Sequence, residues 1–136
     1  MTVTLTIQDY SILVIEPHTQ VCDALRIILN SWGFRVLAVN SIRSAECQML
    51  SNNFTPNLII VDLPLPYIEN ELSFIDDVSK FLTQSDLVVP VIAMTGNSDD
   101  HCRTAVEQMG WTYLLKPFPA SAIFSALTAI SYWRVH

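Results

Sequence analysis

Apolar and polar residues along this chain follow a pattern that predicts five strands and five helices in strict alternation. Short apolar runs, rich in β-branched residues, are typical of strands buried on both faces of a sheet. Such runs occupy residues 11–15, 35–39, 58–62, 87–93 and 111–115. Between and after them, apolar residues recur at helical spacing over about 19–32, 41–51, 71–83, 98–110 and 119–133.

Several residues mark where these elements begin and end. Gly33 and Gly110 follow the first and fourth helices, where a glycine commonly ends a helix. Ser41 is a candidate N-cap of the second helix, and Pro119 fits the first turn of the last one. Pro90 lies inside the fourth predicted strand. It indicates that the sheet needs no backbone N–H at that position.

The alternation predicts an α/β domain with a parallel sheet, helices on both faces and right-handed crossovers. A chain of 136 residues suits a single domain. We expect residues 1–9 to form an N-terminal tail and residues 10–136 to form the domain. Residues 2–7 alternate between polar and apolar types, so an extra edge strand is the alternative to a loose tail.

The composition narrows the classes of partner. The formal net charge is −6 and the seven basic residues are scattered, which argues against nucleic-acid binding by this domain. The apolar runs are far shorter than a membrane span, and residues 1–10 lack the features of a signal peptide. We therefore expect a cytoplasmic protein that is not bound to a membrane.

The three cysteines, Cys22, Cys47 and Cys102, are odd in number and widely spaced. They indicate neither a disulfide framework nor a zinc site, and we expect them to be small buried residues on helices. His18 and Cys22 are four residues apart, but two candidate ligands do not make a metal site. A separate hypothesis is that His18 lies near Asp62 and changes the local charge below neutral pH.

Polar residues stand at the carboxyl ends of four predicted strands. Glu16 follows the first strand, Asp62 ends the third, Thr95 follows the fourth and Lys116 follows the fifth. In open parallel sheets, these ends border the crevice where ligands bind. An aspartate there can attack a phosphoryl group, while a lysine, a hydroxyl and a divalent cation compensate the charge on its oxygens. The sequence therefore predicts a site for phosphoryl chemistry.

Four segments, in order, resemble the receiver domains of bacterial response regulators. They are residues 12–16, 56–66, 91–96 and 110–118, and the resemblance extends from about residue 10 to residue 133. It implies a flavodoxin-like (βα)5 fold with a five-stranded parallel sheet in the order 2-1-3-4-5. It also implies a role in two-component or phosphorelay signalling, with no turnover of an independent substrate.

The resemblance also implies roles for single residues. Asp62 would be the phosphoacceptor, and Lys116 would pair with the phosphoryl oxygens, next to a cis peptide bond to Pro117. Thr95 would be the switch hydroxyl that turns toward the phosphate. Tyr113 would be the aromatic residue that changes rotamer together with Thr95.

Receiver domains bind Mg²⁺, and the resemblance implies three ligands for it here: the carboxylates of Glu16 and Asp62 and the backbone carbonyl of Pro64. One expected ligand is missing, because Pro17 stands where the family usually has a second acid. A proline has no side-chain oxygen to offer a metal. We therefore expect Mg²⁺ binding that is weak or absent.

The favoured function is that of a phosphoacceptor domain, in which Asp62 receives a phosphoryl group from a histidine kinase or a phosphotransfer protein. The alternative, favoured by Pro17, is a degenerate receiver that binds a partner without phosphorylation. A flavin-binding flavodoxin fits less well, because the loop at residues 16–19 begins with an acid and lacks glycine. The last helix is more apolar than one buried face needs, so it and the fifth strand are a candidate homodimer contact.

Overall fold

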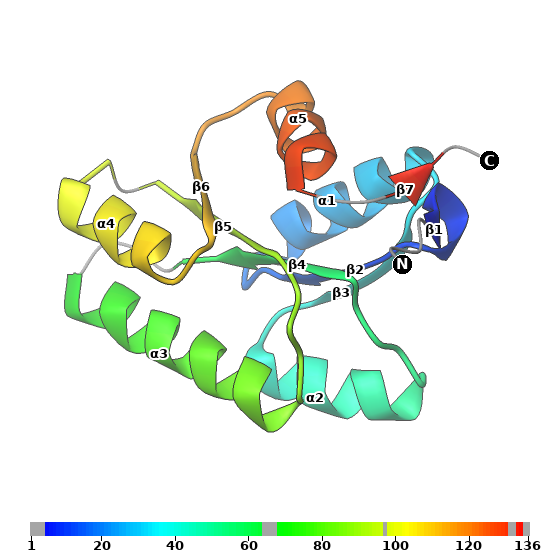
Figure 1. Ribbon diagram of the computed structural model, residues 1–136, viewed down its shortest axis with the longest axis horizontal. Coiled ribbons are helices and arrows are strands. Elements are labelled where there is room, and N and C mark those ends of the chain that lie inside the picture. The colour runs from blue at the N-terminus through cyan, green and yellow to red at the C-terminus, as the bar shows by residue number, and fades with distance from the viewer. Residues whose placement is uncertain (1–4, 64–67, 97, 131–132, 135–136) are drawn as a thin grey trace.

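Five parallel strands form one sheet between two layers of helices in the computed structural model, which describes residues 5–63, 68–96, 98–130 and 133–134 (Figure 1). The strands are β2 (Ser11–Ile15), β3 (Arg35–Val39), β4 (Leu58–Asp62), β5 (Val91–Thr95) and β6 (Thr112–Leu115). Their order is β3-β2-β4-β5-β6. Counted along the chain, this is the order 2-1-3-4-5, and the predicted flavodoxin-like fold is confirmed.

The helices cover both faces of this sheet. They are α1 (Thr19–Ser31), α2 (Ile42–Ser51), α3 (Ile68–Gln84), α4 (Asp100–Gln108) and α5 (Ala120–Ile130). Helices α1 and α5 lie on one face, and α2, α3 and α4 lie on the other (Figure 1). Right-handed crossovers from a strand inside the sheet produce this division, because the chain winds outward first to one edge and then to the other.

Two core clusters follow from the alternation of side chains along the strands. In β2, Ile12 and Val14 pack toward α1 and α5, whereas Leu13 and Ile15 pack toward α2, α3 and α4. Each of these four side chains is at most 1% exposed. Burying one such side chain contributes roughly 1.5–3 kcal/mol. The ends of the central strands are therefore held in fixed positions.

The helix ends match the signals in the sequence. The Ser41 hydroxyl oxygen accepts a hydrogen bond of 3.0 Å from a backbone N–H in the first turn of α2. The Asp99 carboxylate accepts one of 2.7 Å at the start of α4. Gly33 and Gly110 have φ angles of 103° and 77°, a region that glycine adopts without a steric cost. They end α1 and α4, as predicted.

The prediction for the fourth strand was wrong at both ends. We expected residues 87–93, but β5 comprises Val91–Thr95. Pro90 has no N–H to donate, although its carbonyl accepts a hydrogen bond of 3.0 Å from the Ile59 N–H. Val88 is 98% exposed. The apolar run thus begins on the surface, outside the sheet, and the strand itself reaches Thr95.

The described part of the N-terminal segment is not a loose tail. Strand β1 (Leu5–Thr6) pairs in parallel with β7 (Trp133–Arg134) in a two-stranded sheet that is separate from the main one. The 3-10 helix η1 (Ile7–Asp9) follows, and Ile7 is buried in the cluster beneath α1 and α5. The last helix is also shorter than expected, because it ends at Ile130 and Trp133 lies in β7.

Candidate functional site

Four polar side chains converge at the carboxyl ends of the central strands. Asp62 is the last residue of β4 and Thr95 the last of β5, while Glu16 and Lys116 directly follow β2 and β6. The strands lie in the order β2-β4-β5-β6, so their parallel ends meet at one edge of the sheet. Glu16, Asp62 and Thr95 are buried, at 0%, 5% and 0% exposure.

Lys116 connects the two carboxylates of this site. Its ammonium contacts Asp62 Oδ1 directly, and it lies 3.6 Å from Glu16 Oε2. The backbone of Lys116 is fixed as well, because its N–H donates a hydrogen bond of 2.7 Å to the Thr95 carbonyl. The peptide bond from Lys116 to Pro117 is cis, as the resemblance implied. One cation therefore serves two buried acids.

Glu16 is anchored through its backbone and through one of its carboxylate oxygens. Its N–H donates to the Val39 carbonyl and its own carbonyl accepts from the Asn40 side chain, both at 2.9 Å. Oε1 accepts a hydrogen bond of 3.0 Å from the His18 backbone N–H, and the His18 ring Nδ1 lies 3.1 Å from it. Oε2 has no hydrogen-bond partner among the described residues. Pro17, between Glu16 and His18, is exposed.

The electrostatics of the site disfavour a lone anion at Asp62. Burial raises the pKa of the Asp62 carboxyl above its ordinary value, and the Glu16 carboxylate adds to this increase. Lys116 and His18 act in the opposite direction. Desolvation is the largest contribution to this shift, so the ionised Asp62 carboxylate carries a free-energy cost. A further cation bound beside it, or its conversion to another charged group, would reduce that cost.

The carboxylates fit a divalent cation. Glu16, His18 and Asp62 each offer a ligand atom, and these atoms lie within 4.8 Å of one another. Buried oxygens without hydrogen-bond partners, such as Glu16 Oε2, are the ligands that hard cations like Mg²⁺ prefer. The carbonyl of Pro64, the third ligand that the resemblance implied, lies outside the described residues.

The two residues expected to act as a switch lie on one face of the sheet. Thr95 pairs with Leu115 and Ala93 pairs with Tyr113 across β5 and β6. Side chains two residues apart along a strand share a face, so Thr95 and Tyr113 both point toward the side covered by α4. The Arg103 guanidinium of α4 lies 5.5 Å from the centre of the Tyr113 ring, within range of a cation–π interaction.

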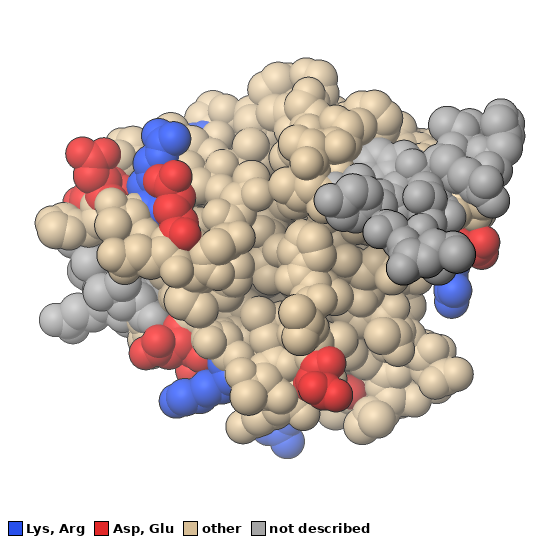
Figure 2. Space-filling view, viewed as in Figure 1, with Lys and Arg blue, Asp and Glu red and all other residues tan. Residues whose placement is uncertain are grey.

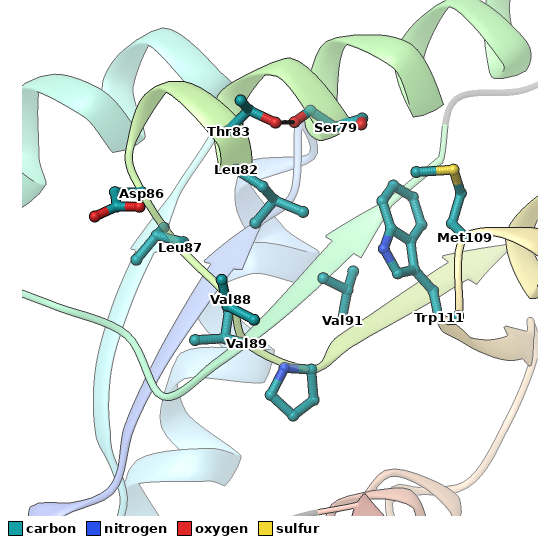
Figure 3. A pocket seen from close by; sticks show the side chains of 12 residues that line it. Ser79, Leu82, Thr83, Asp86, Leu87, Val88, Val89, Val91, Met109 and Trp111 are labelled. Carbon is teal, nitrogen blue, oxygen red and sulfur yellow. Dashed lines mark hydrogen bonds between the residues drawn. The ribbon is translucent and has the colours of Figure 1, made fainter.

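One cavity formed by described residues does not belong to this site. It has a volume of about 460 Å³ and lies at the amino ends of β5 and β6, which is the opposite end of the parallel sheet. Figure 3 shows Trp111 and Met109 on one side of it and Leu82, Leu87 and Val88 on the other. A second cavity, of about 370 Å³, lies between α1 and α5 and extends to Lys116. It is lined mostly by apolar side chains, including Val21, Ile28 and Ile123.

Some site features were not evident from the sequence. The pairing of His18 with Glu16 was missed, although the closeness of the two residues in the chain was a usable signal. The contact between Arg103 and Tyr113 joins different elements and had no signal. The expectation that all three cysteines are buried was wrong, because Cys47 is exposed on α2 while Cys22 and Cys102 are buried.

The visible surface carries few charges. On the face shown in Figure 2, Lys and Arg side chains are sparse and lie next to acidic ones. Among the described residues, no helix combines the length and the apolar character that a membrane span requires.

A model of the response regulator receiver domain matches residues 12–128. The chain therefore belongs to the response regulator receiver domain family. Receiver domains are signalling modules, generally bind Mg²⁺ and interact with kinases or phosphotransfer proteins and with effectors. A search of curated proteins found no match.

Solved structures agree on the fold. The chemotaxis protein CheY4 of Vibrio cholerae is 18% identical, with a TM-score of 0.73, over 90% of this chain and 98% of that one. A response regulator receiver protein from Burkholderia phymatum is 23% identical, with a TM-score of 0.71, over 90% and 94%. The BeF3-activated N-terminal receiver domain of RstA from Klebsiella pneumoniae is 20% identical, with a TM-score of 0.67, over 88% and 97%.

Proposed function

We propose that this receiver domain is a phosphoacceptor and that Asp62 carries the phosphoryl group. The observation that carries the proposal is the contact between Asp62 and the Lys116 ammonium, at the end of the sheet where Thr95 and Glu16 also lie. A carboxylate and an ammonium in contact supply a nucleophile and a group that compensates charge on the transferred phosphoryl oxygens.

The transfer itself is an in-line displacement at phosphorus. A carboxylate oxygen of Asp62 forms a bond to phosphorus while the bond from phosphorus to the phosphohistidine nitrogen of the donor breaks. The nitrogen keeps the electron pair of that bond, and Asp62 becomes an acyl phosphate. Little covalent work falls to the protein, so its contribution is positioning and charge compensation.

The neighbouring residues take distinct parts. Lys116 holds a phosphoryl oxygen, and the Thr95 hydroxyl turns to bind a second one. Glu16 and Asp62 would hold a divalent cation, which would supply positive charge to offset that of the phosphoryl group. Tyr113 lies beside Thr95 on the same face of the sheet, so a movement of Thr95 changes the surface near α4.

The proposed function also implies a phosphodonor and a location in the cell. The donor is a histidine kinase or a phosphotransfer protein of a two-component or phosphorelay pathway, and the protein acts in the bacterial cytoplasm without binding nucleic acid through this domain. The last helix remains a candidate homodimer contact together with β6. Phe124 of α5 is 39% exposed even though its ring packs against Trp32 at 5.0 Å.

A second candidate function is a degenerate receiver that binds its partner without phosphorylation. Pro17 supports it, because a ligand that the family normally uses for Mg²⁺ is absent. The Lys116 ammonium then serves as a permanent counter-ion for Glu16 and Asp62, and the site is a structural one.

Incubation with Mg²⁺ and a small-molecule phosphodonor separates the two functions. The phosphoacceptor function predicts a mass gain of one phosphoryl group that is stable to acid and labile to base. The Asp62→Asn variant should show no gain, and Asp77→Asn, at an exposed position of α3, should behave as the unmodified chain does. A folded protein with no gain under any of these conditions favours the degenerate receiver.

A further inference from the structure

His18 follows Pro17 and turns back onto the buried acids. We propose that His18, Glu16 and Asp62 form a metal site with mixed nitrogen and oxygen ligands, which favours Mn²⁺ and related transition ions over Mg²⁺. This metal site depends on the proposed phosphoacceptor function in one respect only, which is its location at Asp62. It assigns to His18 the place that a second acid has in other receiver domains.

The geometry brings all three ligands together. One atom from each of Glu16, His18 and Asp62 lies within 4.8 Å of the others, which is the spacing that ligands take around one ion. Glu16 and Asp62 are buried, whereas the His18 side chain is 77% exposed. The site is therefore open to solvent on the imidazole side, where a metal and its remaining water ligands can enter.

The hydrogen bonds leave one carboxylate oxygen of Glu16 available. Oε1 accepts from the His18 N–H and lies near the His18 ring. Oε2 is fully buried and has no hydrogen-bond partner among the described residues, and its nearest cation is the Lys116 ammonium at 3.6 Å. A buried charged oxygen without a hydrogen bond is costly, and a bound cation would remove that cost.

The chemistry of the ligands sets the choice of metal. Mg²⁺ takes oxygen ligands and gives up water reluctantly, so an imidazole adds little to its binding. Imidazole nitrogen suits first-row transition ions such as Fe²⁺, Ni²⁺, Cu²⁺ and Zn²⁺. Mn²⁺ is the member of this series with the strongest preference for oxygen ligands, so a gain in its binding over Mg²⁺ is the most stringent sign of the His18 nitrogen. The replacement of an acid by Pro17 thus lowers affinity for Mg²⁺, and His18 restores affinity for a different class of ion.

The competing explanation is a simple ion pair between His18 and Glu16, with no metal. The His18→Asn variant distinguishes the two, because an asparagine amide can still donate to Glu16 while it offers no imidazole nitrogen. Asparagine is also a favourable residue at the N-cap of α1, the position that His18 occupies without a side-chain cap. The variant should therefore fold.

Mn²⁺ binding is measured on the unphosphorylated protein by electron paramagnetic resonance, with Mg²⁺ as a competitor. We expect His18→Asn to lower the preference for Mn²⁺ over Mg²⁺ by about tenfold or more. Removing a residue that only orients a metal ligand already lowers affinity by about tenfold, so removing a ligand should cost at least as much. We also expect electron spin-echo modulation from a directly bound nitrogen in the original chain and none in the variant. His101→Asn, an exposed histidine on α4, is the matched control and should change neither result.

An unchanged preference in His18→Asn, or Mn²⁺ bound without nitrogen modulation, would overturn the proposal. No Mn²⁺ binding at millimolar concentration would overturn it as well. Failure of the phosphoacceptor function is a separate result. If the protein binds Mn²⁺ through His18 and never gains a phosphoryl group, the metal site is supported and the phosphoacceptor function is refuted. If it gains a phosphoryl group and His18 does not affect Mn²⁺ binding, the phosphoacceptor function is supported and the metal site is refuted.

Discussion

The Lys116 ammonium contacts the Asp62 carboxylate although β5 lies between the strands that carry them. The lysine reaches across the end of β5, where its backbone N–H is bonded to the Thr95 carbonyl. It also faces Glu16, so a single side chain offsets two buried negative charges. The stability of this end of the sheet should depend on Lys116 more than on an ordinary surface lysine.

Replacing Lys116 by methionine tests that dependence. The change leaves two buried carboxylates without their cation, and we expect the free energy of unfolding at neutral pH to fall by about 2 kcal/mol. Urea denaturation measures it. Lys80→Met, at an exposed position of α3, is the control, and equal losses in the two variants would contradict the account.

Asp62→Asn should stabilise the protein at neutral pH. Burial raises the pKa of Asp62 above 3.8 in the folded state, so the folded protein binds more protons than the unfolded one between 3.8 and that raised pKa. The free energy of unfolding therefore falls as pH rises through this window. The gain from Asp62→Asn should be largest above the window and should disappear below it.

Denaturation of Asp62→Asn and of the unmodified chain at a series of pH values measures this difference. The same substitution at Asp77, which is exposed, should have no such pH dependence. A gain that grows toward acid pH would mean that the folded-state pKa of Asp62 is lowered, and it would refute this description of the site.

The cysteines should differ in reactivity. Cys47 is exposed, whereas Cys22 and Cys102 are buried, and burial raises the pKa of the Cys22 thiol. Because the thiolate is the reactive form, N-ethylmaleimide at neutral pH should modify Cys47 at least about tenfold faster than Cys22. Mass spectrometry of the digested protein measures the rates. Similar rates before denaturation would contradict the burial of Cys22, and equal rates in urea are the control.

Arg103 and Tyr113 should be energetically coupled. A cation–π contact at an exposed site contributes about 0.5 kcal/mol, and Arg103 is 60% exposed. A double-mutant cycle with Arg103→Ala and Tyr113→Leu measures the coupling by denaturation. Glu107→Ala removes the 3.2 Å contact of its carboxylate with Arg103 and leaves the ring contact in place, so a cycle of Glu107→Ala with Tyr113→Leu should give a smaller coupling.

The fold could be predicted because local patterns determined it. The runs that form β2, β3 and β4 were correct at both ends. Strands β2 and β4 are buried along their whole length, and β3 is a half-buried strand at the edge of the sheet that ends where its apolar residues end. The pattern failed where apolar residues serve another purpose. Val88 is apolar yet exposed before β5, and Trp133 pairs with the N-terminal segment instead of extending α5.

The site was only partly predictable for a related reason. Strand ends brought Asp62, Thr95 and Lys116 to one edge, and topology alone was enough to foresee that. The contact of the His18 ring with Glu16 depends on how the chain turns after Pro17, which no periodicity encodes. Exposure of Cys47 depends on the rotation of α2 against the sheet, which its few apolar residues define weakly.

The most direct test of the central claim is to trap the modified residue chemically. After incubation with Mg²⁺ or Mn²⁺ and a small phosphodonor, sodium borohydride reduces an aspartyl phosphate to homoserine, and mass spectrometry locates the change. The account predicts homoserine at position 62 only in the sample treated with phosphodonor. An unaltered Asp62 in folded protein, with either metal present, would contradict it.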